Sequence, residues 1–211
     1  MTQLNGKLIS IEGGEGAGKS TVLHAIRCFL EHHGYVVVCT REPGGTKLGE
    51  QVRQLLLEPN NKISAKSELL LMFASRAQHV EEVIKPELAN GHMVVSDRFT
   101  DASFAYQGGG RGIDDADIAE LECRFVGLMP DLTLLLDLGV HQGLARAQSR
   151  GQAFDRIELE KTDFFERVRE AYLRRAAQNP ERIKIIDASK SAEEVVQAVE
   201  LQLAQWLQAR C

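Results

Sequence analysis

Residues 13–21 read GGEGAGKST, directly follow the apolar run Leu8–Glu12 and precede a segment of helical periodicity. They match the phosphate-loop motif G-x-x-x-x-G-K-[ST] in the strand-to-helix context that this motif requires. The glycines allow successive backbone N–H groups to point at one anion, and the following helix adds its positive N-terminal end. A turn that only joined a strand to a helix would need neither the lysine nor the hydroxyl group. The pattern therefore predicts a site for the phosphates of a nucleotide.

The side chains of the loop indicate which nucleotide binds. Lys19 is expected to bridge the β- and γ-phosphates, and Ser20 to offer its hydroxyl group to Mg²⁺. The dinucleotide motif G-x-G-x-x-G is not satisfied, and no D-x-x-G or N-K-x-D motif of a GTPase follows, since Asn61–Ser64 ends in serine. ATP is therefore the favoured nucleotide. The residues expected to bind it are Gly13, Gly14, Glu15, Gly16, Ala17, Gly18, Lys19, Ser20 and Thr21.

Five short apolar runs alternate with longer segments of helical periodicity. Because these runs are nearly continuous in apolar character, they fit a parallel sheet that is covered on both faces. Lys19–Glu31 carries an apolar stripe, and Ser191 with Glu194 forms a capping box before the last helix. The order predicts a doubly wound α/β fold with five parallel strands flanked by helices, and ligands at the carboxyl ends of the strands. The expected strands are Lys7–Glu12, Val36–Thr40, Met93–Asp97, Leu132–Asp137 and Ile183–Asp187.

Length and composition narrow the possible partners. A chain of 211 residues suits one domain, residues 1–211, and Gly108–Gly112 is expected to be a loop within it. The formal net charge of −5 argues against a nucleic-acid polymer or an anionic membrane surface as partner. Four widely spaced cysteines indicate reduced thiols, and no apolar run approaches the ~18 residues of a membrane span. A cytoplasmic protein without a structural metal is expected, because the six histidines lack ligand spacing.

Polar residues end the third expected strand in the sequence Ser96-Asp97-Arg98-Phe99. Asp97 could hold Mg²⁺ through water, and Arg98 could bind the phosphate of an acceptor molecule with two hydrogen bonds. The alternative is an ion pair on the surface at a strand end. The position beside the phosphate loop, at the carboxyl edge of the sheet, favours a functional role.

Four further motifs follow the phosphate loop in a fixed order: TREPGGT at 40–46, DRF at 97–99, AYQGGGRG at 105–112 and DRIE at 155–158. With these motifs the chain resembles the bacterial thymidylate kinases over essentially its whole length. The resemblance implies transfer of the γ-phosphoryl group of ATP to dTMP, giving dTDP and ADP, with Mg²⁺ and in a homodimer.

The same resemblance implies the residues that bind dTMP. Glu15 would accept a hydrogen bond from the 3′-hydroxyl group, Tyr106 would lie under the sugar, and Gln107 would face the base. Phe73 would stack on thymine, and Arg76 would donate to a thymine carbonyl. These two residues are three apart on an expected helix and so share a face. Judged by spacing alone, Phe73 fits the protein core better, because it ends an apolar run.

Phosphoryl transfer needs positive charge beyond Lys19. Arg146, Arg150 and Arg156 flank a short polar segment at 151–153, which predicts a lid over residues 146–160. The resemblance is to the bacterial subtype whose lid supplies the catalytic arginine, with Arg150 the first candidate and Arg156 the second. The alternative is a solvated helix face, because Arg146 and Arg150 are four residues apart.

Two other functions stay open at the level of the sequence. One is another nucleoside or nucleoside-monophosphate kinase of the same fold, which would differ in its acceptor contacts. The other is a noncatalytic nucleotide-binding protein that signals to a partner. Such a protein would need a switch element, and none is recognisable after the loop.

Overall fold

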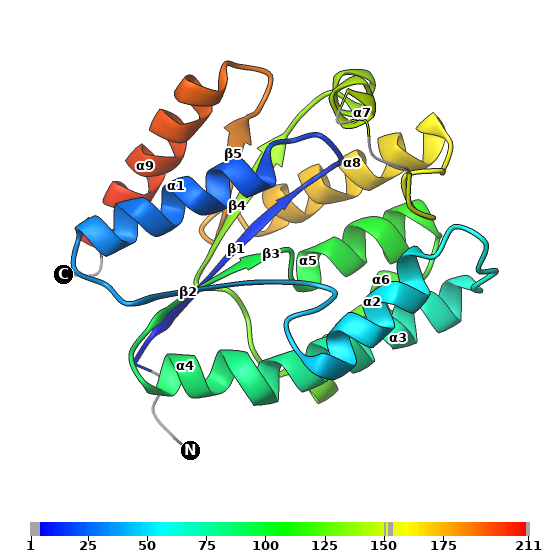
Figure 1. Ribbon diagram of the computed structural model, residues 1–211, viewed down its shortest axis with the longest axis horizontal. Coiled ribbons are helices and arrows are strands. Elements are labelled where there is room, and N and C mark those ends of the chain that lie inside the picture. Colours follow the sequence, from blue (N-terminus) through cyan, green and yellow to red (C-terminus); the bar gives the residue numbers. More distant parts are fainter. Residues whose placement is uncertain (1–4, 150, 152–153, 210–211) are drawn as a thin grey trace.

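A five-stranded parallel sheet forms the centre of the molecule (Figure 1). The structure is a computed structural model and describes residues 5–149, 151 and 154–209. The strand order is β2-β3-β1-β4-β5, which places the strand before the phosphate loop in the middle. The predicted fold class is confirmed, and each strand end lies within one residue of its expected position. The strands are β1 (Lys7–Gly13), β2 (Val37–Arg41), β3 (Met93–Asp97), β4 (Leu132–Asp137) and β5 (Ile183–Asp187).

Helices connect the strands, and several begin with a side-chain cap. At the last helix the Glu194 N–H donates to Ser191 Oγ over 3.2 Å, and the Ser191 N–H donates to the Glu194 carboxylate, which confirms the predicted capping box. In the described part of the chain, no helix is long and apolar enough to cross a membrane. The α-helices are α1 (Lys19–His32), α2 (Lys47–Leu57), α3 (Ala65–His79), α4 (Lys85–Ala89), α5 (Thr100–Ser103), α6 (Asp115–Leu121), α7 (Val140–Gln148), α8 (Thr162–Gln178) and α9 (Ala192–Gln208). Three π-helical turns are η1 (Val80–Ile84), η2 (Phe104–Gly110) and η3 (Glu122–Val126).

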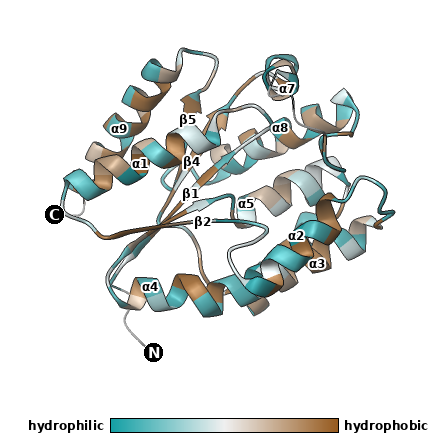
Figure 2. Cartoon of the chain, viewed as in Figure 1, coloured by the Kyte–Doolittle hydropathy of each residue, from teal (hydrophilic) through white to brown (hydrophobic). Residues whose placement is uncertain are grey.

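The two faces of the sheet are covered by different helices. Helices α1 and α9 lie side by side on one face, and α3, α4, α5 and α8 lie toward the other (Figure 1). Alternate residues of β1 point to opposite layers: Ile9 and Ile11 pack with α1 and α9, whereas Leu8 packs with α3 and α4. Figure 2 shows apolar colour along the strands and both colours on the surrounding helices. This double coverage explains the nearly continuous apolar runs in the sequence.

The glycine-rich stretch of the chain is helical and buried at its start, so the prediction of a loop is wrong for its first three glycines. They end the π-helical turn Phe104–Gly110, which packs against α8. A Cβ atom on Gly109 would lie 2.6 Å from Ala171 Cβ, and one on Gly110 would lie 2.4 Å from Phe164 Cε2. Gly109 and Gly110 are therefore required for close packing of this turn on α8.

Candidate active site

The phosphate loop runs from the end of β1 into α1, in the middle of the sheet. Gly13, Gly16 and Gly18 have φ angles of 143°, 70° and 90°, which L side chains rarely adopt. Lys19 bends back over the loop and donates from Nζ to the carbonyl oxygens of Gly13 (3.2 Å) and Gly14 (3.0 Å). Burial and the nearby Arg98 guanidinium lower the Lys19 pKa. The backbone thus has the curvature that a phosphate-binding loop needs.

A polar cleft of about 410 Å³, here called the loop cleft, opens beside this loop. Loop residues 15–20, the ends of β2 and β3, and parts of α2 and α7 line it. Five cations from several separate elements reach it, and five carboxylates line it as well, so the cleft is strongly charged with both signs. These cations are Lys19, Arg41, Arg53, Arg98 and Arg146.

Asp97 lines the loop cleft together with Lys19 and Ser20. Its Oδ1 atom is buried and has no hydrogen-bond partner among the described residues. The Ser20 hydroxyl group is exposed. No group of three or more His, Cys, Asp or Glu side chains in the described ranges is arranged to hold a metal by itself. One unsatisfied carboxylate oxygen and one hydroxyl group nevertheless fit Mg²⁺, because this ion takes few protein ligands and completes its shell with phosphate oxygens and water.

Arg98 adopts a strained backbone conformation at the edge of the loop cleft. Its φ angle is 73°, in the left-handed region, and it is the residue other than glycine with positive φ in the described chain. Its N–H donates to Ile11 O (2.9 Å), and its carbonyl oxygen accepts from Ser96 Oγ (2.7 Å). Its Nη1 atom donates to Gly13 O (3.2 Å). A conformation of this kind costs about 1–3 kcal/mol and persists where the surroundings determine it.

Three predicted acceptor residues meet at one point. Glu15 accepts hydrogen bonds from Arg98 Nη2 (2.9 Å) and from the Tyr106 hydroxyl group (3.0 Å). The Arg98 guanidinium also lies 4.8 Å from the centre of the Tyr106 ring. The structure therefore brings together the three residues that were expected to contact the sugar and phosphate of the acceptor.

A second cavity of about 130 Å³, here called the α3 cavity, adjoins the loop cleft. Gln107 lines it, as do Tyr106 and Met72, but Phe73 does not. Phe73 is 3% exposed and lies in a core cluster on the α3 side of the sheet. Met72, one residue earlier on α3, occupies the cavity wall where the sequence predicts a stacking ring.

Arg76 is also buried and already bonded. Its Nε donates to Glu42 Oε2 (2.6 Å), Nη1 to Ser103 Oγ (2.9 Å) and Nη2 to Phe99 O (2.9 Å). The guanidinium lies 4.9 Å from the centre of the Phe73 ring. The base contacts expected of Phe73 and Arg76 stay predictions that the observed side-chain positions do not support.

Arg146 and Arg156, the two predicted lid arginines among the described residues, line different cavities. Arg146 donates to Ala188 O (2.9 Å) and lines the loop cleft. Arg156 lines the α3 cavity, where Nε donates to Leu56 O (2.7 Å) and Nη2 to Glu68 Oε2 (2.6 Å). Arg156 therefore faces the second cavity rather than the phosphate loop. Arg150, the first candidate for the catalytic role, lies outside the described residues.

Sequence reasoning missed a buried acid at the base of the site. Glu12 accepts hydrogen bonds from the Phe99 N–H (2.7 Å) and the Tyr172 hydroxyl group (2.7 Å). Burial, followed by the negative charge of Asp101, raises the Glu12 pKa to about 8, against the opposing effects of Tyr172, Arg98 and the Phe99 N–H. A charged residue at the end of a fully buried strand was the only signal in the sequence.

Arg53 was missed as well, because no motif surrounds it. It projects from α2, donates from Nη1 to Pro43 O (3.1 Å) and lines both the loop cleft and the α3 cavity. Burial and then the charge of Arg41 lower its pKa. An arginine shared by two adjoining cavities is suited to contact phosphates in both.

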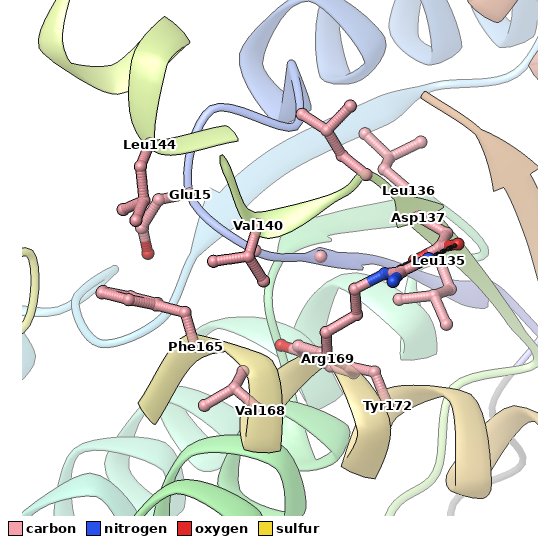
Figure 3. Close-up of a pocket in the computed structure, with 13 residues that line it drawn as sticks. Glu15, Leu135, Leu136, Asp137, Val140, Leu144, Phe165, Val168, Arg169 and Tyr172 are labelled. Atoms are coloured by element: carbon pink, nitrogen blue, oxygen red, sulfur yellow. Dashed lines mark hydrogen bonds and ion pairs between the residues drawn. The ribbon is translucent and has the colours of Figure 1, made fainter. Parts of the chain in front are cut away.

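A third cavity, of about 20 Å³, lies between the start of the phosphate loop, β4, α7 and α8 (Figure 3). Its walls are mainly apolar, with Val140 and Phe165 projecting into it (Figure 3). At one side Arg169 from α8 pairs with Asp137, with Nε 2.7 Å from Oδ1. This volume has room for a single water molecule, so the cavity is not a nucleotide site.

The central strand order, the phosphate loop and two adjoining cavities at the carboxyl ends of the strands define the class of the protein. It is a P-loop phosphotransferase with the nucleoside monophosphate kinase fold.

Comparisons with known proteins narrow this class. The family model described as thymidylate kinase matches residues 11–199. The thymidylate kinase of Nitrosospira multiformis is 51% identical over 202 residues, covering 95% of this chain and 98% of that protein. The thymidylate kinase of Pseudomonas putida strain GB-1 is 55% identical over 195 residues, covering 91% of this chain and 92% of that protein. The crystal structure of thymidylate kinase from Ehrlichia chaffeensis superposes with a TM-score of 0.76 at 33% identity, over 96% of this chain and 98% of that one. The chain belongs to the thymidylate kinase family.

Proposed function

We propose that this enzyme transfers the γ-phosphoryl group of ATP to dTMP where the loop cleft meets the α3 cavity. The supporting observation is that the two cavities share part of their walls, including Glu15, Arg53 and Arg98. ATP in the loop cleft and a monophosphate in the α3 cavity would bring their phosphates together at these residues. In-line transfer depends mainly on such positioning and on positive charge around the transferred group.

The residues of the loop cleft take the roles that their chemistry allows. The loop amides and Lys19 hold the β- and γ-phosphates of ATP, and Arg98 holds the acceptor phosphate. Ser20 and Asp97 hold Mg²⁺, Asp97 directly or through water. When bound, the ion neutralises phosphate charge. Two hydrogen bonds hold the Arg98 backbone in its left-handed conformation, so its guanidinium is positioned before the acceptor binds.

The α3 cavity recognises the nucleoside part of the acceptor. Glu15 and Tyr106 contact the sugar, in line with their mutual hydrogen bond of 3.0 Å. Gln107 faces the base with its Oε1 atom, which is buried and has no partner among the described residues. The ring N–H of thymine is a hydrogen-bond donor that this oxygen can accept.

The segment over residues 146–160 acts as the lid, and Arg150 supplies the catalytic positive charge. Arg156 docks the lid on the α3 cavity, as its bonds to Leu56 and Glu68 indicate. Closure of a lid excludes water from the transferred group. These two arginines thus act on different partners, ATP and the acceptor respectively.

The enzyme works as a homodimer. Leu70 on α3 and Phe125 on η3 are 58% and 60% exposed, and they line a shared groove that a second copy would cover. Light scattering after size exclusion should give twice the monomer mass, and Leu70→Glu combined with Phe125→Glu should give the monomer. A monomeric wild-type enzyme would overturn this part of the proposal.

The described cysteines support a reducing compartment. Cys28, Cys39 and Cys123 are exposed and free. Exposed free thiols are typical of the cytoplasm, where glutathione and thioredoxin keep them reduced. We therefore place the enzyme there, with ATP and dTMP as its small-molecule partners.

An acceptor panel tests the activity. Purified enzyme with ATP and Mg²⁺ is offered dTMP, dUMP, UMP, CMP, AMP or thymidine, and ADP release is measured. The expected result is the highest kcat/KM for dTMP. Preference for another monophosphate would indicate a different kinase of this fold, and ATP binding without any acceptor-dependent turnover would indicate a noncatalytic protein.

A further inference from the structure

Glu68 is a buried carboxylate at the start of α3 that joins the α3 cavity to the lid. Its side chain is 1% exposed, and it lines the cavity. Oε1 accepts from Gln107 Nε2 (2.9 Å) and Arg111 Nε (3.2 Å). Oε2 accepts from Arg156 Nη2 (2.6 Å) and Arg111 Nη2 (3.2 Å). One side chain thus contacts the base-facing amide, the lid arginine and a third residue that anchors it.

The ionised carboxylate determines which end of the Gln107 amide faces the cavity. Burial acts to raise the Glu68 pKa, but hydrogen bonds from Gln107, Arg111 and Arg156 outweigh it and lower the pKa below its usual value. An ionised carboxylate only accepts hydrogen bonds, so Gln107 must turn its NH₂ group toward it. The Gln107 oxygen is then directed away from Glu68; it is buried without a partner among the described residues, and Gln107 lines the α3 cavity.

We propose that Glu68 is a positioning residue for acceptor selection, which fixes the Gln107 amide with its oxygen toward the acceptor base and docks Arg156 of the lid over the same cavity. This inference rests on the function proposed above. It assigns a role to a residue that does not contact the phosphates in that proposal. Glu68 itself does not react. It acts through the two side chains that it holds.

The fixed amide discriminates between pyrimidines by their hydrogen-bonding pattern. Thymine and uracil carry a ring N–H between two carbonyl groups, which can donate to the Gln107 oxygen. Cytosine carries an unprotonated ring nitrogen in that place, so two acceptors would oppose each other. A buried acceptor left unpaired carries its full desolvation penalty. If the amide could turn around, the preference for the N–H group would weaken.

The lid depends on the same carboxylate. Arg156 donates from its backbone N–H to Leu57 O (3.0 Å) and from Nε to Leu56 O (2.7 Å), so the segment is pinned to the end of α2. The bond to Glu68 extends this contact to α3. Gln107, which contacts the base, and Arg156, which docks the lid, therefore both donate to the Glu68 carboxylate.

The test replaces Glu68 by an amide of the same shape, Glu68→Gln, and measures kcat/KM and equilibrium affinity for dTMP and dCMP. The neutral side chain offers an NH₂ group where Gln107 and both arginines also donate, so the Gln107 amide is free to turn. We expect the ratio of the dTMP value to the dCMP value to fall about 10-fold, because loss of the Arg156 contact affects both acceptors whereas loss of the fixed Gln107 amide affects only dTMP. A variant in which both values fall by the same factor, or neither changes, would overturn the proposal.

A matched control and a double variant separate positioning from general damage. Glu160 also pairs with Arg111 (2.5 Å) but contacts neither Gln107 nor Arg156 in the described structure, so Glu160→Gln should keep the dTMP to dCMP ratio. In a Gln107→Leu background, Glu68→Gln should leave the ratio unchanged, because the group through which it acts is gone. A further fall in the dTMP to dCMP ratio in that background would contradict the proposed action of Glu68 through Gln107.

Two further outcomes keep the inference testable. If Glu68→Gln does not fold, Glu68→Asp retains the charge but withdraws the carboxylate, and a smaller loss of selectivity is expected. The wild-type enzyme distinguishes the two proposals: no turnover with any deoxypyrimidine monophosphate would remove the proposed function itself. Selective turnover of dTMP with an unchanged ratio in the Glu68 variants would remove only the positioning role.

Discussion

The loop cleft and the α3 cavity adjoin each other but are built in opposite ways. The loop cleft is centred on one continuous stretch, residues 15–20, whose backbone and single lysine carry the phosphate chemistry, and residues from other elements complete its walls. The α3 cavity contains no such stretch: each of six parts of the chain gives it between one and four residues, and its walls are fixed by buried pairs such as Glu68 with Arg156. One site depends on local backbone conformation, and the other depends on long-range contacts between side chains.

This difference follows from what each site has to recognise. Phosphates are similar in every nucleotide, and backbone amides at a helix start bind them without regard to the base. A base and a sugar are recognised by their shape and by the direction of each hydrogen bond, which requires side chains held from several directions. Changes in the loop cleft should therefore affect kcat, and changes in the α3 cavity should affect acceptor binding and selectivity.

The largest effect is expected from the lid, where the two arginines should separate the sites. Arg150→Ala should lower kcat about 10³- to 10⁵-fold with little change in the KM for dTMP, because an arginine on the transferred phosphoryl group acts in the transition state. Arg156→Ala should mainly raise the KM for dTMP, since Arg156 lines the α3 cavity. Steady-state kinetics with both substrates varied would measure kcat and the KM for dTMP in each variant. A loss of kcat in Arg156→Ala and a raised KM in Arg150→Ala would exchange the two roles.

Lys19→Ala should have the next largest effect. Loss of this ammonium group should lower kcat about 10²- to 10³-fold, by analogy with other single charge-stabilising groups in active sites. The affinity for dTMP, measured by calorimetry without ATP, should stay within a factor of two or so of wild type. Lys190→Ala, at an exposed position, is the control and should change neither value. Weaker dTMP binding in the Lys19 variant would contradict the assignment of ATP and dTMP to separate cavities.

A smaller effect on stability is expected where η2 packs on α8. Gly110→Ala places a methyl group 2.4 Å from Phe164 Cε2, so the free energy of unfolding should fall by about 1–3 kcal/mol. Gly139→Ala is the matched control, because φ there is −58° and no atom lies within 4 Å of the added carbon. Its effect should stay within about 0.5 kcal/mol. Urea unfolding would compare the two, and equal effects would show that this packing is not tight.

Glu12, at the base of the site, should make the free energy of unfolding depend on pH. Its pKa of about 8 in the folded chain exceeds the ordinary value of 4.5, so the folded state holds a proton that the unfolded state has lost between these pH values. Wild-type stability should therefore decrease by about 1.4 kcal/mol per pH unit over this window from this group. Glu12→Gln should abolish that contribution. If the free energy of unfolding changed with pH in the same way in both proteins, Glu12 would not be its source.

Sequence reasoning was most successful where the relevant interactions are local. The strands, the capping box of Ser191 and Glu194, and the phosphate loop all follow from periodicity or from contacts within a few residues. For Phe73, spacing alone favoured the core, where the side chain lies, whereas the resemblance implied a stacking role; neither pointed to Met72 as the residue that lines the cavity. Sequence reasoning failed for Glu12, whose partner Tyr172 is 160 residues away in the chain, and for Arg53, which no motif surrounds.

By itself the sequence determined the parallel α/β fold and the loop that binds phosphate, because backbone conformation and apolar periodicity act over short distances along the chain. Only the tertiary structure decided which side chains form the α3 cavity. It turned Phe73 into the core, exposed Met72 to the cavity and brought Glu68 to Gln107 and Arg156 across 39 and 88 residues. Such contacts depend on how helices pack on the sheet, and no local pattern encodes that packing.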